Sequence, residues 1–185
     1  RDGILDALDY YIETLGDNDN LLIYYAGHGW LDEAGAQGYW LPVDAKESRR
    51  SKWVANVTIT TTLKALEAKH VMVIADSCYS GTLIRGIRVA DRTPYYVQRM
   101  ARKRARVVLT SGGLEPVADL GGGGHSPFAN SLIEVLAANA SVMDGTSMFS
   151  QLRRLVVLSA DQTPEYSDAR KAGHEGGDFM FVRVR

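Results

Sequence analysis

Two short apolar runs constrain the fold of this chain more than any other feature. Leu21–Ala26 and Val71–Ala75 are continuous in apolar and aromatic residues, as is typical of strands that are buried on both faces of a sheet. Apolar residues at helical spacing precede each run, over 4–15 and 59–66. Because strands alternate with helices, the sequence predicts an α/β domain with a mostly parallel sheet and helices on both faces.

The second half of the chain continues the alternation. Val107–Thr110 and Phe179–Val182 are predicted as a third and a last strand, and Met148–Val156 as a helix. Another helix is expected to begin at Ser126-Pro127, because a hydroxyl cap followed by proline is a common helix start.

Size and charge exclude several classes of protein. The 185 residues are enough for one domain, and 21 Lys and Arg against 22 Asp and Glu give a net charge of −1. That balance argues against a general nucleic-acid binder, and no apolar run reaches the roughly 18–20 residues that cross a bilayer. One cysteine excludes an internal disulfide and favours a reducing compartment, so a cytoplasmic location is expected.

Two candidate catalytic residues follow the two apolar runs. His28 comes directly after the first run with a glycine on either side, in a polar loop expected over 27–38, and Cys78 follows the second run. If the two strands are neighbours in a parallel sheet, both residues lie at the edge where such sheets carry their chemistry. A thiol beside a base is a nucleophile pair.

Structural roles compete with these functional ones. A lone cysteine is often an inert buried residue. Three other histidines could also supply a base: His70 leads into a strand and is predicted to be structural, while His125 and His174 lie in loops and are weaker candidates.

The two motifs together resemble a known family. His28-Gly29 and the Asp-Ser-Cys-Tyr-Ser-Gly of 76–81 resemble the paired His-Gly and Asp-X-Cys motifs of the caspase-like cysteine peptidases, and most closely the bacterial metacaspase, paracaspase or orthocaspase relatives. The resemblance extends along most of the chain, through Gly38–Ala45, Ser111–Asp119, Ser126–Phe128, Gln162–Pro164 and Gly177–Phe179.

The resemblance implies a fold: a caspase-like three-layer sandwich with a six-stranded sheet, of which the sequence shows four strands. The family's first strands are expected to be missing ahead of Arg1, so that 1–185 is one amino-terminally incomplete peptidase domain. The chain would then divide into a large-subunit-like part over 1–84, a basic linker over 85–106 and a small-subunit-like part over 107–185.

The resemblance also implies a mechanism. Cys78 would attack the scissile carbonyl as a thiolate, and His28 would activate the thiol and protonate the leaving amine. Backbone N–H groups of Gly29 and Cys78 would hold the oxyanion.

Charge near the nucleophile predicts the specificity. Asp76 stands two residues before Cys78, and a carboxylate there favours a substrate with Arg or Lys before the scissile bond. Similarity to metacaspases and paracaspases points the same way and makes Asp119 a second pocket candidate. Glu115 competes with Asp119 for that role, and a loop-capping role competes for Asp76.

The basic linker carries seven arginines and one lysine against a single acidic residue, Asp91. A solvated helix face is the plain interpretation, and a phosphate-binding patch is the second. An enzyme that cuts after Arg or Lys could also process itself here.

No cofactor is expected. Many metacaspases need calcium, but the candidate ligands Asp32, Glu33 and Asp44 form no dense acidic run. The expected partners are protein or peptide substrates, with no nucleic acid and no membrane. The chain is expected to be a monomer, although a dimer through Phe179–Val182 stays open.

Three alternatives to a Cys-His peptidase remain. The first is a catalytically silent caspase-like scaffold or signalling module, against which the intact His28 and Cys78 argue. The second is a related legumain-, gingipain- or separase-type peptidase. The third is an α/β hydrolase or binding domain in which Cys78 is structural.

Overall fold

The computed structural model describes all residues except 33, 78–82, 86–93, 114–123, 170 and 185. The elements follow one another in this order: α1 (Asp2–Thr14), β1 (Asn20–Ala26), β2 (His28–Asp32), β3 (Gln37–Leu41), the 3-10 helix Arg50–Lys52, β4 (Val54–Ala55), α2 (Asn56–Ala65), β5 (His70–Asp76), β6 (Ile84–Arg85), α3 (Pro94–Arg102), β7 (Ala105–Thr110), α4 (Pro127–Ala138), β8 (Val142–Asp144), α5 (Gly145–Ser159), β9 (Glu165–Ala169) and β10 (Met180–Val182).

The main sheet has the strand order β1-β5-β7-β9-β6. β1, β5 and β7 run parallel, while β9 is antiparallel to β7 and β6 is antiparallel to β9. The first two apolar runs are therefore neighbours, in a register that pairs Ala26 with Asp76. The predicted α/β class, with a sheet that carries parallel strands and helices on both faces, is confirmed.

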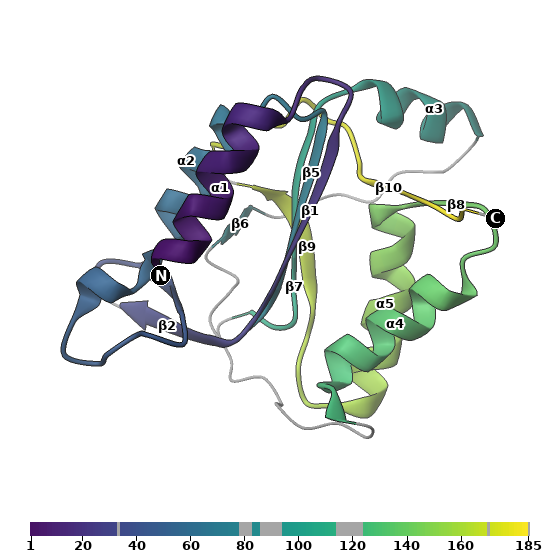
Figure 1. The fold of residues 1–185 in the computed structure, drawn as a ribbon. Coiled ribbons are helices and arrows are strands. Elements are labelled where there is room, and N and C mark those ends of the chain that lie inside the picture. Colours follow the sequence, from purple (N-terminus) through teal and green to yellow (C-terminus); the bar gives the residue numbers. More distant parts are fainter. Residues whose placement is uncertain (33, 78–82, 86–93, 114–123, 170, 185) are drawn as a thin grey trace.

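Each face of the sheet has its own core. Alternate residues of β5 point to opposite faces, so Val71, Val73 and Ala75 pack with the residues of α1 and α2, while Met72 and Ile74 pack with those of α4 and α5. Figure 1 shows the two helix pairs on opposite sides of the strands. Both faces of β5 are thus covered, which explains its continuous apolar sequence.

The loop expected over 27–38 is largely a β-hairpin. β2 and β3 pair antiparallel, with His28 opposite Leu41 and Trp30 opposite Tyr39. Aromatic residues favour strands and pack against one another across a pair, so Trp30 and Tyr39 were signals for strands that the polar composition of the loop obscured. His28 is consequently the first residue of a strand.

The carboxyl-terminal strand also differs from its prediction. β10 covers Met180–Val182 and pairs with β8 in a separate two-stranded sheet. The main sheet instead takes β9, with the sequence Glu-Tyr-Ser-Asp-Ala, which has no apolar run and lies between β7 and β6. An apolar-run criterion does not detect such a strand.

The basic segment contains a helix and the start of a strand. α3 spans Pro94–Arg102, and β7 begins at Ala105, so Arg106 belongs to the sheet. Arg106 has no exposed surface and its guanidinium donates to the carbonyls of Leu63 and Leu66, both at 2.7 Å. These carbonyls lie at the end of α2, where the helix leaves acceptors unpaired and favours a cation.

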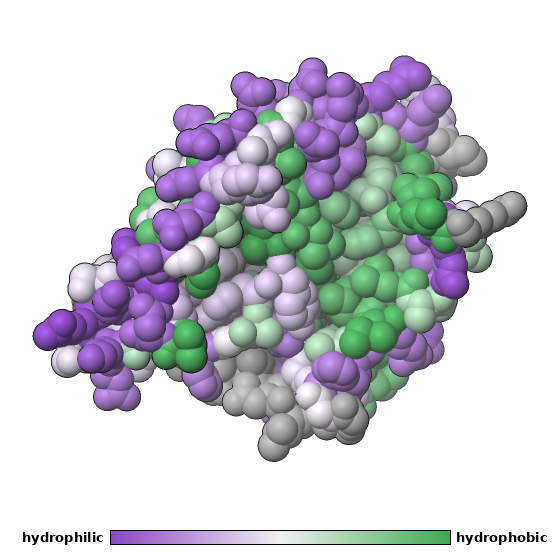
Figure 2. All heavy atoms as spheres, in the orientation of Figure 1, coloured by the Kyte–Doolittle hydropathy of each residue, from purple (hydrophilic) through white to green (hydrophobic). Residues whose placement is uncertain are grey.

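The surface view places apolar side chains along β1 and over α4 and α5, while the outer side of α1 is mostly polar (Figure 2). β1 is an edge strand, and its Leu22 and Tyr24 are about two-fifths exposed (40% and 42%). None of the helices in the described ranges is both long and apolar enough to cross a membrane.

Candidate active site

The side chains at the carboxyl end of β1 alternate between the two faces of the sheet. Leu21, Ile23 and Tyr25 pack into the core on the α1 and α2 side. Tyr24 and Ala26 therefore point to the α4 side, as Asp76 does on β5 beyond Ile74. The pleat of two neighbouring strands thus gathers Tyr24 and Asp76 on one face.

Asp76 is held by two hydroxyl groups on that face. The Tyr24 hydroxyl donates to Oδ2 of Asp76 at 3.2 Å, and the Ser126 hydroxyl donates to the same oxygen at 2.6 Å. Ser126 is also the N-cap of α4, as the sequence predicted, and its Oγ accepts from the backbone N–H of Ala129 at 2.9 Å. Asp76 therefore links β5 to β1 and to the start of α4.

Burial of Tyr24 and the nearby carboxylate of Asp76 raise the pKa of the Tyr24 phenol above its ordinary value. Both causes disfavour a phenolate. The Tyr24 hydroxyl is consequently a donor at neutral pH.

A cavity of about 410 Å³ opens beside this carboxylate. It is lined by residues of β1, the β1–β2 turn, β5 and the start of α4, and it includes His28, Asp76, His125 and Ser126. His28 and His125 are both exposed. The structure thus brings the predicted base and the predicted specificity residue to one cavity.

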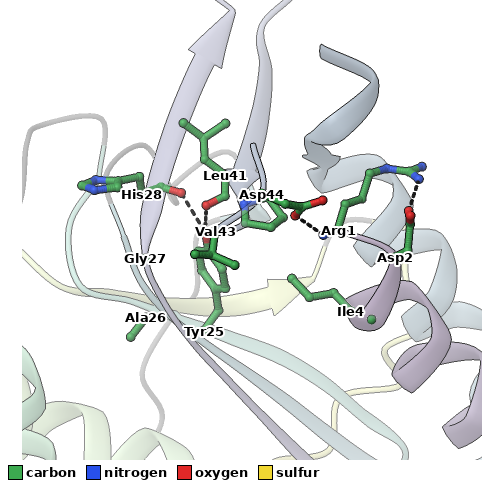
Figure 3. Close-up of a pocket in the computed structure, with 12 residues that line it drawn as sticks. Arg1, Asp2, Ile4, Tyr25, Ala26, Gly27, His28, Leu41, Val43 and Asp44 are labelled. Carbon is green, nitrogen blue, oxygen red and sulfur yellow. Dashed lines mark hydrogen bonds and ion pairs between the residues drawn. The ribbon is translucent and has the colours of Figure 1, made fainter. Parts of the chain in front are cut away.

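A second cavity, of about 750 Å³, lies on the other side of His28. It is lined by the first residues of the chain, the end of β1 and the segment 41–44, and it includes Tyr25, Leu41 and Val43. Figure 3 shows that the His28 imidazole points away from Leu41 and Asp44, while its backbone carbonyl faces Tyr25. His28 lines both cavities.

Tyr25 fixes the backbone at His28. Its hydroxyl lies 2.8 Å from the carbonyl oxygen of His28 and 3.1 Å from that of Leu41, the residue opposite His28 in the hairpin (Figure 3). Its ring stacks on Trp40 with centroids 4.3 Å apart. Burial raises the pKa of Tyr25 to about 12, so the hydroxyl remains a donor at neutral pH.

Gly27 permits this arrangement. A Cβ at this position would stand 2.8 Å from the Tyr25 hydroxyl oxygen, which is closer than a real Cβ approaches. The backbone N–H of Gly27 donates to the Asp76 carbonyl at 3.3 Å, so the contact between the two strands extends to the turn. A larger residue would displace Tyr25, and with it the anchor of His28.

Some of the remaining predicted residues lie in the described part of the structure and others do not. Cys78 and Asp119 lie outside the described residues, as does Glu115. Gly29 lies in β2 opposite Trp40. Of the candidate calcium ligands, Glu33 also lies outside the described residues. Asp32 pairs with Arg50 at 2.6 Å and Asp44 with Lys52 at 3.7 Å.

The other two histidines lie away from the site. His70 is buried, and its ring nitrogens lie 2.7 Å from Asn20 Oδ1 and 3.1 Å from the Lys103 carbonyl, which confirms the structural role predicted for it. Nδ1 of His174 accepts from the backbone N–H of Arg106. Burial lowers the pKa of both imidazoles, so both favour the neutral form.

Sequence reasoning missed two residues of the site, Tyr24 and Ser126. Tyr24 counted only as part of an apolar run and Ser126 only as a helix cap. The signal for Tyr24 was the period-2 alternation within the run, which places it on the same face as Ala26. Nothing in the sequence alone connects Ser126 with Asp76, because 50 residues separate them.

Comparisons with known proteins identify the family and the fold. The family model of the caspase domain (Peptidase C14) matches residues 1–172. Protein GSU0716 from Geobacter sulfurreducens is similar in structure, with a TM-score of 0.62 at 19% identity over 91% of this chain and 73% of that chain. Caspase-1 from Spodoptera frugiperda gives a TM-score of 0.50 at 14% identity over 89% of this chain and 67% of its own.

The search of curated proteins found no match. Structural likeness at such low identities shows the fold alone, whereas the family model covers most of the chain. The predicted resemblance to the caspase-like family is confirmed: the chain belongs to the caspase-domain family of peptidases.

Proposed function

We propose that this protein is a cysteine endopeptidase that cleaves after Arg or Lys, with Cys78 as nucleophile and His28 as general acid and base. The observation that carries the proposal is the register that pairs Ala26 with Asp76 on adjacent parallel strands. His28 and Cys78 each follow a member of this pair by two residues.

Chain connectivity supports a Cys-His pair. Neighbouring strands lie about 4.8 Å apart, and two residues span at most about 7 Å. His28 and Cys78 are therefore tied to the same small region of the sheet edge. A thiol and an imidazole within hydrogen-bond reach are the minimum for acyl-enzyme chemistry.

The steps follow from these roles. His28 takes the proton of the Cys78 thiol, and the thiolate adds to the scissile carbonyl. The oxyanion is stabilised by the backbone N–H groups of Gly29 and Cys78. His28 then protonates the amine, which leaves as the C–N bond breaks. His28 next takes a proton from the water that attacks the thioester, and the C–S bond breaks to release the acid and the Cys78 thiol.

Asp76 supplies the proposed specificity. Its carboxylate lines the cavity that His28 also lines, so a cationic side chain there would find a partner close to the proposed base. Asp119 remains a second proposed pocket residue.

Peptide cleavage tests the proposal directly. A fluorogenic series with Arg, Lys, Asp or Asn before the scissile bond is to be incubated with wild-type protein and with Cys78→Ala. The expected result is cleavage of the Arg and Lys peptides by wild type alone. A folded protein that cleaves none of them would favour the silent scaffold, and preferred cleavage after Asn would favour a legumain-type enzyme.

Asp76→Asn is expected to lower kcat/KM for the Arg peptide by about 10- to 150-fold, the range of a lost charge-assisted hydrogen bond. Activity on a citrulline peptide should change little, because citrulline has nearly the shape of Arg without its charge. The ratio of the two rates is the measurement. An unchanged ratio would mean that Asp76 does not bind the substrate cation. Asp76 would then be a loop-capping residue that holds the hydroxyls of Tyr24 and Ser126.

We also propose that the activity needs no calcium. Asp32 and Asp44 each face a cation, and no group of three or more His, Cys, Asp or Glu side chains in the described ranges could hold a metal ion. Activity on the Arg peptide is expected to stay the same in EDTA. A loss with EDTA that added calcium reverses would contradict this.

Autoprocessing in the basic segment is a further part of the proposal, with its sites restricted by burial. Arg99 and Arg102 lie on the exposed side of α3, whereas Arg106 is fully buried and Arg104 donates to the carbonyls of Leu66 and Glu67. Mass spectrometry after incubation should find cuts at or before Arg102 in wild type only. Fragments of Cys78→Ala, or cuts after Arg106, would contradict this.

Location and oligomeric state complete the proposal. The lone cysteine agrees with a cytoplasmic, reducing location. The pairing of β10 with β8 covers one side of the last strand, so we propose a monomer; a sedimentation experiment would detect a dimer through Phe179–Val182.

A further inference from the structure

Two hydroxyl groups converge on one oxygen of Asp76. Tyr24 from β1 and Ser126 from the start of α4 both donate to Oδ2, at 3.2 and 2.6 Å. No residue that the structure describes donates to Oδ1. A carboxylate offers about two lone-pair directions on each oxygen, so these two donors occupy Oδ2 and leave Oδ1.

The direction of the Ser126 bond is fixed by a second contact. Ser126 Oγ accepts the N–H of Ala129 at 2.9 Å, so its single hydrogen is directed to Asp76. α4 has 12 residues, and its positive amino-terminal end favours an anion at this place. The carboxylate is thus held on the helix side by a hydroxyl whose oxygen is fixed in place by the helix cap.

The Tyr24 bond is fixed by the sheet. Tyr24 lies opposite Ile74 in the register, so its ring reaches diagonally to Asp76, two residues further along β5. Such diagonal neighbours are within reach of an aromatic side chain. The Tyr24 hydroxyl remains protonated at neutral pH and donates to Asp76.

We propose that Tyr24 and Ser126 are specificity-determining positioning residues, which together with Asp76 form a clamp that makes the pocket accept Arg and Lys alike. The inference rests on the proposed function, since it assigns the cation to Asp76. A guanidinium discriminates against an ammonium by a two-bond fork that uses both carboxylate oxygens. With Oδ2 occupied, only end-on pairing with Oδ1 is left, and an ammonium makes that bond as well as a guanidinium does.

Loss of either hydroxyl should change the Arg-to-Lys preference, which a simple loss of structure would not do. Removing either hydroxyl frees a lone pair of Oδ2, so Arg gains the fork and Lys does not. The preference for Arg over Lys therefore rises. A merely structural role of Tyr24 or Ser126 would weaken binding of both side chains equally and leave their ratio unchanged.

Binding to Cys78→Ala protein separates this inference from catalysis. Fluorescein-labelled peptides that differ only in Arg, Lys or citrulline are titrated by fluorescence anisotropy into Cys78→Ala alone and combined with Tyr24→Phe or Ser126→Ala. The Arg and Lys affinities of the Cys78→Ala parent should agree within about threefold and exceed that for citrulline. Each added substitution should raise the Arg-to-Lys affinity ratio by about threefold or more.

Three controls match these variants. Tyr10→Phe removes a hydroxyl from an exposed tyrosine of α1 and should leave the ratio unchanged. Ser126→Thr keeps the hydroxyl and should keep the parent ratio. In an Asp76→Asn background Tyr24→Phe should have no further effect, because coupled residues are not additive.

The outcomes are distinguishable. An unchanged Arg-to-Lys ratio in both Tyr24→Phe and Ser126→Ala, or equal affinity of the parent for all three peptides, overturns the clamp. If Cys78→Ala shows the expected ratios while wild type cleaves none of these peptides, the clamp stands and the proposed catalysis fails.

Discussion

Replacement of His28 by alanine is expected to lower kcat for an arginyl peptide by about 10²–10⁴-fold, which is the usual contribution of a positioned general acid–base group. KM should stay nearly constant, because proton transfer occurs in the transition state and not in the bound ground state. His28 can serve because Tyr25 holds its carbonyl and Gly27 leaves room for the Tyr25 hydroxyl. Steady-state kinetics with a fluorogenic peptide provide the measurement.

His125→Ala is the matched control for this experiment. His125 is exposed and lines the same cavity as His28, but it comes from the segment before α4 and not from the strand beside β5. The expected kcat of His125→Ala is within about threefold of wild type. If His125→Ala lost more activity than His28→Ala, the role of base would pass to His125.

Much of this site was predictable because it depends on local sequence. Buried parallel strands have continuous apolar sequences, and such sheets carry their chemistry at the carboxyl ends. The apolar runs Leu21–Ala26 and Val71–Ala75 therefore predicted β1 and β5. The positions just after these runs contain the site residues His28 and Asp76. The cap of α4 was also predictable, since it needs only Ser126 and Pro127.

The rest depends on contacts between distant residues. Ser126 reaches Asp76 across 50 positions, and β9 joins the main sheet through pairing with β7 and β6 without an apolar run of its own. The hairpin of β2 and β3 was hidden by its polar and glycine residues, although Trp30 and Tyr39 pair across it. Long-range pairing of this kind leaves little trace in local composition.

Arg106 is the clearest case of a residue whose role the sequence concealed, and its replacement gives the largest expected effect on stability. In a row of basic residues it resembles a linker arginine, yet it has no exposed surface. Besides Leu63 and Leu66, its guanidinium donates to the carbonyls of Ala105 at 2.8 Å and Lys69 at 3.2 Å. It thus joins the first residues of β7 to the end of α2.

Arg106→Met should lower the free energy of unfolding by about 2–4 kcal/mol, because charge-assisted hydrogen bonds contribute about 1.5–3 kcal/mol each and the freed carbonyls stay buried. Part of this loss is offset, because the substitution also removes the cost of burying a charge. That burial lowers the pKa of Arg106 to about 10. At neutral pH the guanidinium is still charged. Urea denaturation followed by circular dichroism measures the change.

Arg104→Met is the control, because among the described residues Arg104 donates two longer bonds, at 3.2 and 3.1 Å, one of them at an exposed site. Its loss should be under about 1 kcal/mol. Arg106→Lys should recover little, since an ammonium cannot reach carbonyls on both sides as the guanidinium does. Catalytic rates of the folded variants should equal that of wild type, because Arg106 lies at the start of β7 and the site lies beyond the opposite ends of β1 and β5. An Arg106→Met protein as stable as wild type would mean that water satisfies these carbonyls and that the guanidinium adds no net stability.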